Sequence, residues 1–221
     1  MSGNRFSAVI FDFDGLLVDS EPVQIAAWER YLERFGVSLT DDVLASMYGR
    51  RLSDASAAAV EMLQLPVSPE EVARDRDEIF LETVPGNIHA KPGAVTAVQW
   101  VSAQGIPLAL ATSGHRRYID LALDSAGIPR LFDAEITGEL VSHGKPDPET
   151  FLRAAEALGY APGDCVVVED SPNGVMAAKR AGAFCIAVPD GPEHRDLLTG
   201  ADVVLDSLLE LPAFLYSPDR E

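Results

Sequence analysis

Five short apolar runs, each ending near a polar residue, most constrain what this chain can fold into. Continuous apolar runs of this length suit strands that are covered on both faces, as in a parallel sheet. Segments with the spacing of amphipathic helices lie between them, each followed closely by a glycine. The runs are residues 6–11, 106–111, 165–168, 184–188 and 202–205, and the helical segments are residues 93–104, 115–126, 148–158 and 174–181. This alternation predicts an α/β protein with a doubly wound, Rossmann-like parallel sheet.

One long segment breaks the alternation. From about Leu17 to Pro85 the sequence contains no convincing strand, and its periodicity is helical over residues 23–35, 41–47, 54–63 and 69–83. A block of helices is therefore predicted to be inserted directly after the first strand, with Gly15 and Pro85-Gly86 as hinge positions. We expect a core domain formed by residues 1–15 and 87–221, and a small α-helical domain formed by residues 16–86.

The chain is strongly acidic, with 35 Asp and Glu against 17 Lys and Arg and a formal net charge of −18. A nucleic-acid-binding protein needs a basic face, and anchoring on an anionic membrane needs clustered cations. We therefore expect neither nucleic acid nor membrane as a partner. A local cation can overrule the global field, so an anionic small substrate is compatible with this charge.

The sequence also lacks the features that indicate export. Cys165 and Cys185 both lie in apolar runs, which favours two buried thiols over a disulfide. No apolar stretch reaches the roughly 18 residues of a membrane helix. The segment Met1–Arg5 is not a basic region followed by a long apolar segment and a cleavage site, so we expect no signal peptide. We expect a soluble cytoplasmic protein that is a monomer or a weak dimer.

Polar side chains follow three of the predicted strands at the point where each strand ends. Asp12 and Asp14 follow the first run, Thr112 follows the second, and Glu169-Asp170 follows the third. In an open α/β sheet the ligand crevice lies outside the carboxyl ends of the strands, so we expect these groups to meet. Asp12 and Asp14 share one side of an extended segment, where two carboxylates repel unless a cation lies between them or one is protonated.

Such a set of groups suits phosphoryl transfer. One carboxylate can attack phosphorus and form an aspartyl-phosphate, while a second moves the protons of the leaving group and of water. Mg²⁺ would bridge the carboxylates and the phosphate, because it prefers oxygen ligands. Thr112-Ser113-Gly114 offers a hydroxyl and backbone N–H groups to the phosphoryl oxygens. Lys145, one of only three lysines in the chain, lies in the Pro-stiffened segment 144–148 and offers a fixed cation.

Four segments of the chain resemble, in order, the four motifs of the haloacid dehalogenase-like superfamily of phosphatases and phosphomutases. They are residues 12–22 (DFDGLLVDSEP), 111–114 (ATSG), 144–148 (GKPDP) and 168–174 (VEDSPNG). The inserted helices are similar to the small cap of the subfamily that contains β-phosphoglucomutase and many sugar-phosphate phosphatases. The resemblance covers essentially the whole chain.

This resemblance implies roles for the acidic residues. Asp12 would be the nucleophile and a Mg²⁺ ligand. Asp14 would be the general acid and base, with its backbone carbonyl on the metal. Asp170 would complete the protein ligands, and Glu169 would bind the metal directly or through water.

The resemblance also implies how the phosphoryl group is held. Thr112 would bind it, assisted by the main chain of Ser113 and Gly114, and Lys145 would neutralise the nucleophile and the phosphate together. Members of the family often have a cis peptide before the proline of the third motif, so the bond between Lys145 and Pro146 is predicted to be cis.

Two chemistries of the family fit this sequence poorly. Haloacid dehalogenases attack carbon and do not need the second acidic residue, which Asp14 supplies here. Phosphonatases use a lysine of the cap, and no lysine occurs between Leu16 and Pro85. The chain therefore resembles the phosphatases and phosphomutases more than these enzymes.

The cap residues favour a phosphatase over a mutase. Gln24 stands where the mutase carries a histidine, and Arg50 and Arg51 lie one or two positions before its phosphate-gripping arginine. Arg76 aligns roughly with a cap lysine of the mutase. We expect these four residues to contact substrate, and we expect a Mg²⁺-dependent phosphatase that acts on a small phosphorylated sugar or polyol.

Two alternatives stay open at this point. A phosphomutase of the β-phosphoglucomutase type would use the same aspartyl-phosphate but pass it to a second hydroxyl. A phospho-accepting receiver domain or a binding scaffold would not turn over at all. The paired Asp12 and Asp14 and the inserted helical domain favour an enzyme.

Overall fold

The computed structural model describes residues 6–47 and 52–216. The chain divides into two compact units, one formed by Met1–Asp19 with His89–Glu221 and the other by Ser20–Ile88. The junctions follow Asp19 and Ile88 rather than residues 15 and 86. The reason is that strand β2 (Val18–Asp19) pairs antiparallel with strand β3 (His89–Ala90), which keeps both in the first unit.

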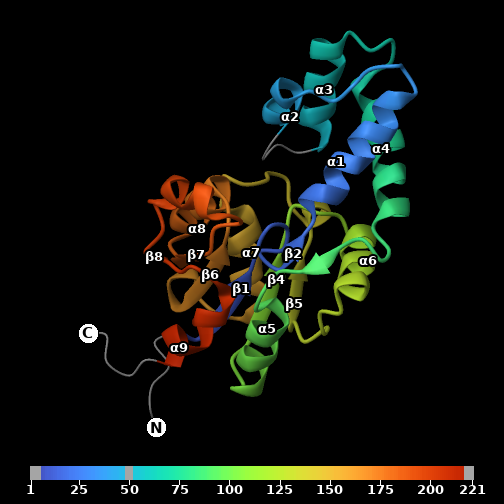
Figure 1. Ribbon diagram of the computed structural model, residues 1–221. Helices are drawn as coiled ribbons and strands as arrows, with labels where there is room; N and C mark the ends of the chain where they lie inside the picture. Colours follow the sequence, from blue (N-terminus) through green and yellow to red (C-terminus); the bar gives the residue numbers. More distant parts are fainter. Residues whose placement is uncertain (1–5, 48–51, 217–221) are drawn as a thin grey trace. The chain divides into compact units, whose positions relative to one another are not determined.

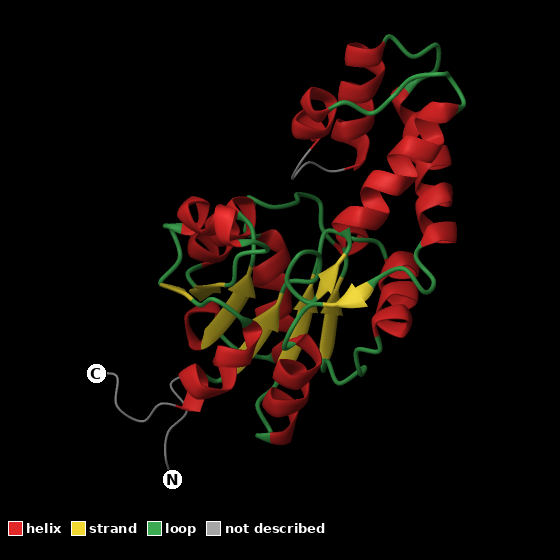
Figure 2. Cartoon of the chain, in the orientation of Figure 1, coloured by secondary structure: helices red, strands yellow, loops and turns green. Residues whose placement is uncertain are grey.

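The first unit contains a six-stranded parallel sheet with the order β5-β4-β1-β6-β7-β8 (Figures 1 and 2). Strand β1 lies between β4 and β6, so the chain builds the sheet outward from β1 in both directions. The strands are β1 Ala8–Phe11, β4 Leu108–Ala111, β5 Ala134–Ile136, β6 Cys165–Glu169, β7 Phe184–Ala187 and β8 Val203–Val204. This topology confirms the predicted doubly wound α/β fold.

Helices cover both faces of this sheet, with α5 in front of it and α7 and α8 behind it in the view of Figure 1. The helices of this unit are α5 Ala94–Ala103, α6 Arg116–Ala126, α7 Glu149–Leu158, α8 Pro172–Ala181 and α9 Leu211–Tyr216. Short 3₁₀ turns lie at Gly138–Leu140, Pro162–Asp164, Pro192–Leu198 and Leu208–Glu210. The predicted helices are confirmed to within about two residues at each end.

The apolar runs form strands because both of their faces are buried. Ala8 and Ile10 of β1 pack with Phe151 of α7 in one core, while Val9 and Phe11 point to the opposite face. All four strand residues are at most 1% exposed. Burial on both sides removes the alternation of polar and apolar residues that a half-exposed strand would show.

The second unit is helical and has an apolar core of its own. Its helices are α1 Glu21–Glu33, α2 Asp41–Met47, α3 Leu52–Leu63 and α4 Pro69–Thr83. Trp28, Tyr31 and Leu32 of α1 pack with Val72 of α4 in that core. The Ser68 hydroxyl caps α4 by accepting a hydrogen bond from the Glu71 N–H over 3.2 Å.

Three short strands differ from the prediction. Strand β5 was not expected, and β2 contradicts the expectation of no strand after Leu17. Strand β5 has three residues at the sheet edge, and β2 and β3 have two residues each. Segments this short display no periodicity, and they are strands only because a partner distant in sequence pairs with them.

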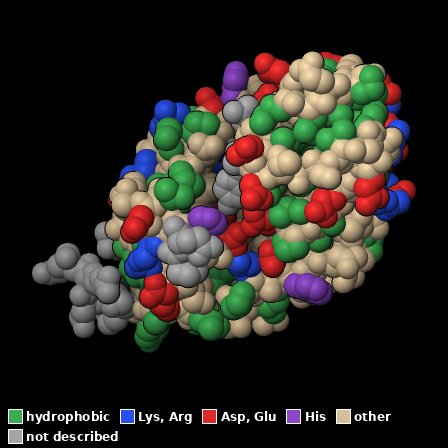
Figure 3. Space-filling model, turned by 45° about the horizontal axis from the view of Figure 1, so that its top comes forward, with side chains coloured by type: hydrophobic (Ala, Val, Ile, Leu, Met, Phe, Trp, Pro, Cys, Tyr) green, Lys and Arg blue, Asp and Glu red, His purple; other side chains and the backbone are tan. Residues whose placement is uncertain are grey.

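Two further expectations concern cysteines and membranes. Cys165 and Cys185 are buried and unbridged, as predicted. Burial raises the pKa of their thiols, to about 11 for Cys165 and about 12 for Cys185. Among the described residues, no helix combines the length and the apolar character needed to cross a bilayer. Acidic side chains outnumber basic ones on the face shown in Figure 3, in keeping with the net charge.

Candidate active site

The candidate site forms where three adjacent strands of the sheet end. Asp12 directly follows β1, Thr112 directly follows β4, and Glu169 is the last residue of β6. Pairing continues beyond the first strand, because the Asp12 N–H donates to the Val168 carbonyl over 2.9 Å. The Thr112 N–H likewise donates to the Ile136 carbonyl over 2.9 Å. Since these strands are parallel neighbours, the residues after them reach the same edge of the sheet.

Lys145 joins this cluster from the segment before α7. Its ammonium group donates to the Asp12 carboxylate and, over 2.7 Å, to Glu169 Oε1. The Ala111 carbonyl accepts a longer hydrogen bond from it, over 3.4 Å. The side chain is 8% exposed, and its ammonium lies 4.6 Å from the centre of the Phe151 ring. The peptide bond that follows Lys145 is cis, as predicted. Lys145 is thus a buried cation held between two carboxylates.

Burial dominates the electrostatics of these groups. It raises the pKa of Asp12 to about 7, with Lys145 opposing this change and Glu169 adding to it. Burial also raises the pKa of Asp170, assisted by the negative charges of Glu169 and Asp12. Burial alone would lower the pKa of Lys145, but the two carboxylates outweigh it and the pKa rises. One lysine therefore offsets only part of the negative charge that converges here.

Asp12, Glu169 and Asp170 could hold a metal ion. One oxygen from each of the three carboxylates lies within 4.8 Å of the others. Hard divalent cations prefer such all-oxygen ligand sets. A cation among these carboxylates would also offset the repulsion between their negative charges. The donor set and its charge therefore fit a divalent cation.

The Glu169 carboxylate is held against the N-terminus of α8. Its Oε2 accepts from the N–H groups of Asp170 and Ser171, each over 2.8 Å, and from the Ser171 hydroxyl over 3.0 Å. The Ser171 hydroxyl oxygen in turn accepts from the Gly174 N–H over 3.1 Å and caps the helix. The partial positive charge at the helix N-terminus and these donors attract the Glu169 carboxylate oxygens. Glu169, which is fully buried, is therefore fixed between the helix and Lys145.

Two glycines allow the acidic cluster to pack this closely. A Cβ at Gly174 would lie 1.7 Å from Glu169 Oε1, and a Cβ at Gly15 would lie 2.1 Å from Asp170 Oδ2. Gly15 also has a φ of +79°, in the left-handed region that other residues disfavour. The positions of two site carboxylates thus depend on the absence of a side chain opposite them.

Replacing Gly174 by alanine is expected to destabilise the fold. Helix propensity alone favours alanine over glycine by about 1 kcal/mol. The new methyl group would displace the Glu169 carboxylate from its donors, which costs about 1–3 kcal/mol. We expect a net loss of about 1 kcal/mol in urea unfolding. Gly163→Ala is the matched control, because its Cβ would lie 3.8 Å from the Gly182 carbonyl oxygen. Equal unfolding midpoints for the two variants would contradict this account.

The turn after β4 has a defined shape. Thr112 is 1% exposed, and its Oγ1 accepts from the Gly114 N–H over 2.9 Å. The Gly138 N–H donates to the Gly114 carbonyl over 2.9 Å. A Cβ at Gly138 would lie 2.3 Å from the Ser113 carbonyl oxygen, so the two loops pack backbone to backbone. Because Thr112 Oγ1 accepts from the Gly114 N–H, the Thr112 hydroxyl can still donate its own proton to a ligand. Ser113, between these two residues, is exposed.

Asp14 contacts a residue that no sequence motif singles out. Its Oδ1 accepts a hydrogen bond from the hydroxyl of Tyr118 in α6. Tyr118 is 2% exposed, and its ring meets Phe13 edge to face with 5.9 Å between the ring centres. In the sequence Tyr118 is only one apolar-face position of a predicted helix. The distance in sequence between Thr112 and Tyr118 does not indicate that the Tyr118 hydroxyl reaches the site.

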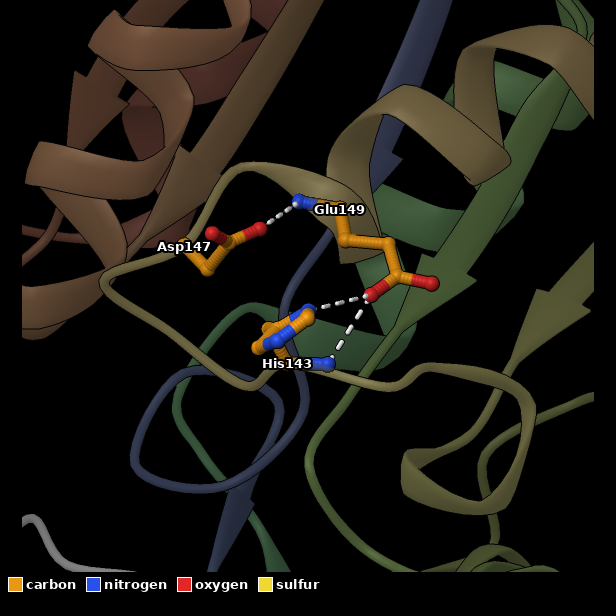
Figure 4. Close-up of side chains that lie close together, drawn as sticks. All are labelled: His143, Asp147 and Glu149. Atoms are coloured by element: carbon orange, nitrogen blue, oxygen red, sulfur yellow. Dashed lines mark hydrogen bonds and ion pairs between the residues drawn. The ribbon is translucent and has the colours of Figure 1, made fainter.

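A second polar cluster braces the loop that carries Lys145 (Figure 4). Glu149 Oε2 accepts from the N–H groups of Ser142 and His143, each over 2.9 Å, and Asp147 Oδ1 accepts from the Glu149 N–H over 3.0 Å. The backbone donors, His143 first, lower the pKa of Glu149 to about 2. A ring nitrogen of His143 and carboxylate oxygens of Asp147 and Glu149 also lie within 4.8 Å of one another, close enough to hold a metal ion. The hydrogen bonds of Asp147 and Glu149 instead account for the shape of this loop.

Gln24 and Arg76, both expected to contact substrate, contact each other in the helical unit. Arg76 donates to the Gln24 backbone carbonyl over 3.0 Å and to Gln24 Oε1. Its guanidinium lies 5.2 Å from the centre of the Trp28 ring and 4.9 Å from that of Phe80. Arg76 is only 2% exposed, so its described contacts place it in the packing of this unit and beside Gln24. The other two expected cap residues, Arg50 and Arg51, lie outside the described residues.

Carboxylates that converge on a lysine at the carboxyl edge of a parallel sheet are typical of enzymes that transfer phosphoryl groups. Comparison with known proteins narrows this class. A family model described as haloacid dehalogenase-like hydrolase matches residues 6–182. The chain therefore belongs to the haloacid dehalogenase-like hydrolases, as its motifs predicted, and it is an enzyme. Membership of a hydrolase family weighs against the receiver and scaffold alternatives.

Individual relatives extend over nearly the whole chain. It is 36% identical over 206 residues to validoxylamine A 7'-phosphate phosphatase of Streptomyces hygroscopicus subsp. limoneus, covering 93% of this chain and 96% of that protein. It is 34% identical over 209 residues to hexitol phosphatase A of Escherichia coli K12, covering 94% of each. A HAD family hydrolase from Deinococcus radiodurans R1, solved with bound phosphate and sodium, has a TM-score of 0.76 and 31% identity, covering 98% of this chain and 97% of that one.

Proposed function

We propose that this enzyme hydrolyses the phosphate monoester of a small sugar or polyol, using Mg²⁺ and an aspartyl-phosphate formed on Asp12. The observation that carries the proposal is the Lys145 ammonium between Asp12 and Glu169 at the edge of the sheet. An anionic nucleophile can approach an anionic phosphate only where fixed positive charge offsets their repulsion. Lys145 supplies that charge beside the proposed nucleophile.

In the first step Asp12 attacks phosphorus through a carboxylate oxygen. The bond between phosphorus and the sugar oxygen breaks, and Asp14 gives its proton to that leaving oxygen. The Thr112 hydroxyl and the main chain of Ser113 and Gly114 hold the phosphoryl oxygens, with Gly114 exchanging its Thr112 contact for phosphate. Lys145 stabilises the negative charge on both sides of the new bond.

In the second step water attacks the aspartyl-phosphate. Asp14, now a carboxylate, accepts a proton from that water, the bond between phosphorus and Asp12 breaks, and inorganic phosphate leaves. Asp12 is regenerated as a carboxylate and Asp14 as an acid. In a mutase a second hydroxyl of a sugar phosphate would replace water in this step.

The proposed metal site uses residues already described. Asp12, Asp170 and the backbone carbonyl of Asp14 would hold Mg²⁺. Glu169 would contact it through water, because both Glu169 oxygens already accept hydrogen bonds from protein donors. When bound, Mg²⁺ would neutralise the phosphate and orient it toward Asp12.

Removing divalent metal is expected to abolish turnover. Without a cation, the Asp12 and Asp170 carboxylates repel the substrate phosphate, and a single lysine cannot offset them. Excess chelator should lower phosphate release by at least about 100-fold, and added Mg²⁺ should restore it. The control is addition of the chelator already saturated with Mg²⁺, which should leave the rate unchanged. Activity that survives the free chelator would contradict the metal assignment.

The substrate class rests on the relatives and on the sequence of the helical unit. One phosphatase compared above is named for validoxylamine A 7'-phosphate and the other for hexitol, a polyol. Gln24 and Arg76, together with Arg50 and Arg51, are the residues that we propose select the substrate. Arg76 would act in part through Gln24, whose side-chain oxygen it holds. A cytoplasmic location, a monomeric or weakly dimeric state, and the absence of nucleic-acid and membrane partners stay predictions from the sequence.

Phosphate release from a panel of sugar and polyol monophosphates with Mg²⁺ tests this function. In parallel, β-glucose 1-phosphate with trace bisphosphate primer is assayed for conversion to glucose 6-phosphate. Phosphate release without isomerisation is the expected result. Isomerisation with little free phosphate would instead establish the mutase alternative. Absence of both activities, with Mg²⁺ present and the protein folded, would overturn the proposal.

A further inference from the structure

We propose that Tyr118 is a positioning residue for Asp14, an inference that rests on the proposed acid–base role of that aspartate. The Tyr118 hydroxyl donates to Asp14 Oδ1 across a separation of 104 residues in the chain. This hydrogen bond holds Oδ1 in place, and in the proposal the other oxygen, Oδ2, gives and takes the transferred proton. Tyr118 thereby selects which edge of the carboxyl group faces the reaction.

Tyr118 is itself held from several sides. Its ring meets Phe13 edge to face, and a Cβ at Gly114 would lie only 2.8 Å from its Cδ1. Its backbone N–H donates to His115 Nδ1 over 3.3 Å at the start of α6. The side chain is 2% exposed. The hydroxyl is therefore placed by packing and by the helix start, before any substrate arrives.

The contact matters because a carboxyl group can rotate about its terminal torsion. A general acid contributes only when its proton points at the leaving oxygen in the transition state. A hydrogen bond from a buried hydroxyl to a carboxylate is charge-assisted and is stronger than a neutral one. Tyr118 can thus keep Asp14 in one orientation through both proton transfers. Asp14 gives the proton in the first transfer and accepts it in the second.

The test compares two leaving groups in the full-length Tyr118→Phe variant. The first substrate is the sugar or polyol phosphate found by the panel, whose alkoxide leaving group needs a proton. The second is p-nitrophenyl phosphate, whose phenolate leaves without one. Because kcat/KM covers steps only through formation of the aspartyl-phosphate, it isolates the acid-catalysed step. We expect kcat/KM to fall by about 10-fold for the alkyl phosphate and to be nearly unchanged for the aryl phosphate.

Two further variants make the outcome decisive. Tyr160→Phe removes the hydroxyl of a half-buried tyrosine elsewhere in the same unit and is expected to leave kcat/KM unchanged for both substrates. Asp14→Asn should show the same preference for the aryl phosphate, in larger degree. If Asp14→Asn retains full activity on the alkyl phosphate, the acid–base assignment itself fails.

If Asp14→Asn loses that activity but Tyr118→Phe does not, the positioning role is overturned and the proposed function stands. Equal losses on both substrates in Tyr118→Phe would also overturn it, because general loosening of the site does not distinguish leaving groups. An unchanged KM with a lowered kcat for the alkyl phosphate would support the proposal, since positioning acts in the transition state.

Discussion

Replacing Asp12 by asparagine is expected to lower turnover by at least about 10,000-fold. Asparagine has nearly the same shape, but its amide cannot attack phosphorus and form the acyl phosphate. Asp12 lies directly after β1, is 6% exposed and contacts the Lys145 ammonium. Phosphate release in a coupled assay measures the loss.

The fold of Asp12→Asn should be preserved. Burial and the charge of Glu169 raise the pKa of Asp12, so removing its charge relieves repulsion in the cluster. Lys145 keeps its ion pair with Glu169, 2.7 Å away. We expect the free energy of unfolding to change by no more than about 1 kcal/mol.

A labelling experiment and a control variant test the role of Asp12 directly. Brief reaction with labelled substrate followed by acid quench should trap phosphate on the wild-type protein and not on Asp12→Asn. Asp206→Asn is the control, because Asp206 forms a surface ion pair with Arg195 and is 77% exposed. A labelled Asp12→Asn protein, or turnover within 10-fold of wild type, would exclude Asp12 as the nucleophile.

The Lys145→Met variant should be strongly destabilised as well as inactive. Lys145 is 8% exposed, and its removal leaves the buried carboxylates of Asp12 and Glu169 without their shared cation. Breaking a buried ion pair on one side costs about 3–5 kcal/mol. Because Asp12 can relieve part of that cost by binding a proton, we expect about 3 kcal/mol in metal-free urea unfolding. Loss of the cation that stabilises phosphoryl transfer should lower turnover by at least about 100-fold.

Lys179→Met provides the matched control for this prediction. Lys179 also forms an ion pair, with Asp202 over 2.6 Å, but it is 40% exposed. Exposed pairs contribute about 0–1 kcal/mol, because solvent screens them and both side chains lose mobility. Similar unfolding midpoints for Lys145→Met and Lys179→Met would show that the site lysine does not stabilise the cluster.

Local patterns account for much of the agreement between prediction and fold. The apolar runs at residues 6–11 and 165–168 could be identified as strands because burial on both faces leaves a continuous apolar stretch. Asp12 and Glu169 could then be placed at one edge, because parallel strands deliver their carboxyl ends together. Strand β5 could not be predicted, because its three residues form a strand only through pairing with β4.

Contacts between side chains that are distant in the sequence could not be predicted from local patterns. The Tyr118 hydroxyl in α6 reaches Asp14 although the two residues are 104 positions apart in the chain. Arg76 was expected to contact substrate because it aligns roughly with a cap lysine of the mutase, and the sequence did not indicate that its guanidinium lies against the rings of Trp28 and Phe80. Local periodicity indicates only which face of a helix is buried. It shows neither how far the helix is rotated about its axis nor which rotamer a side chain adopts.

The α/β class, the helical insertion and the chemical groups at the strand ends could thus be predicted from the sequence, because they depend on periodicity and on the rules of parallel sheets. How those groups are held depends on the packing of the folded chain. The Lys145 ammonium between Asp12 and Glu169, the Glu169 carboxylate on the N-terminus of α8, and the Tyr118 hydroxyl on Asp14 all join segments far apart in the chain. Such contacts arise from close packing of whole elements, which no local stretch of sequence specifies.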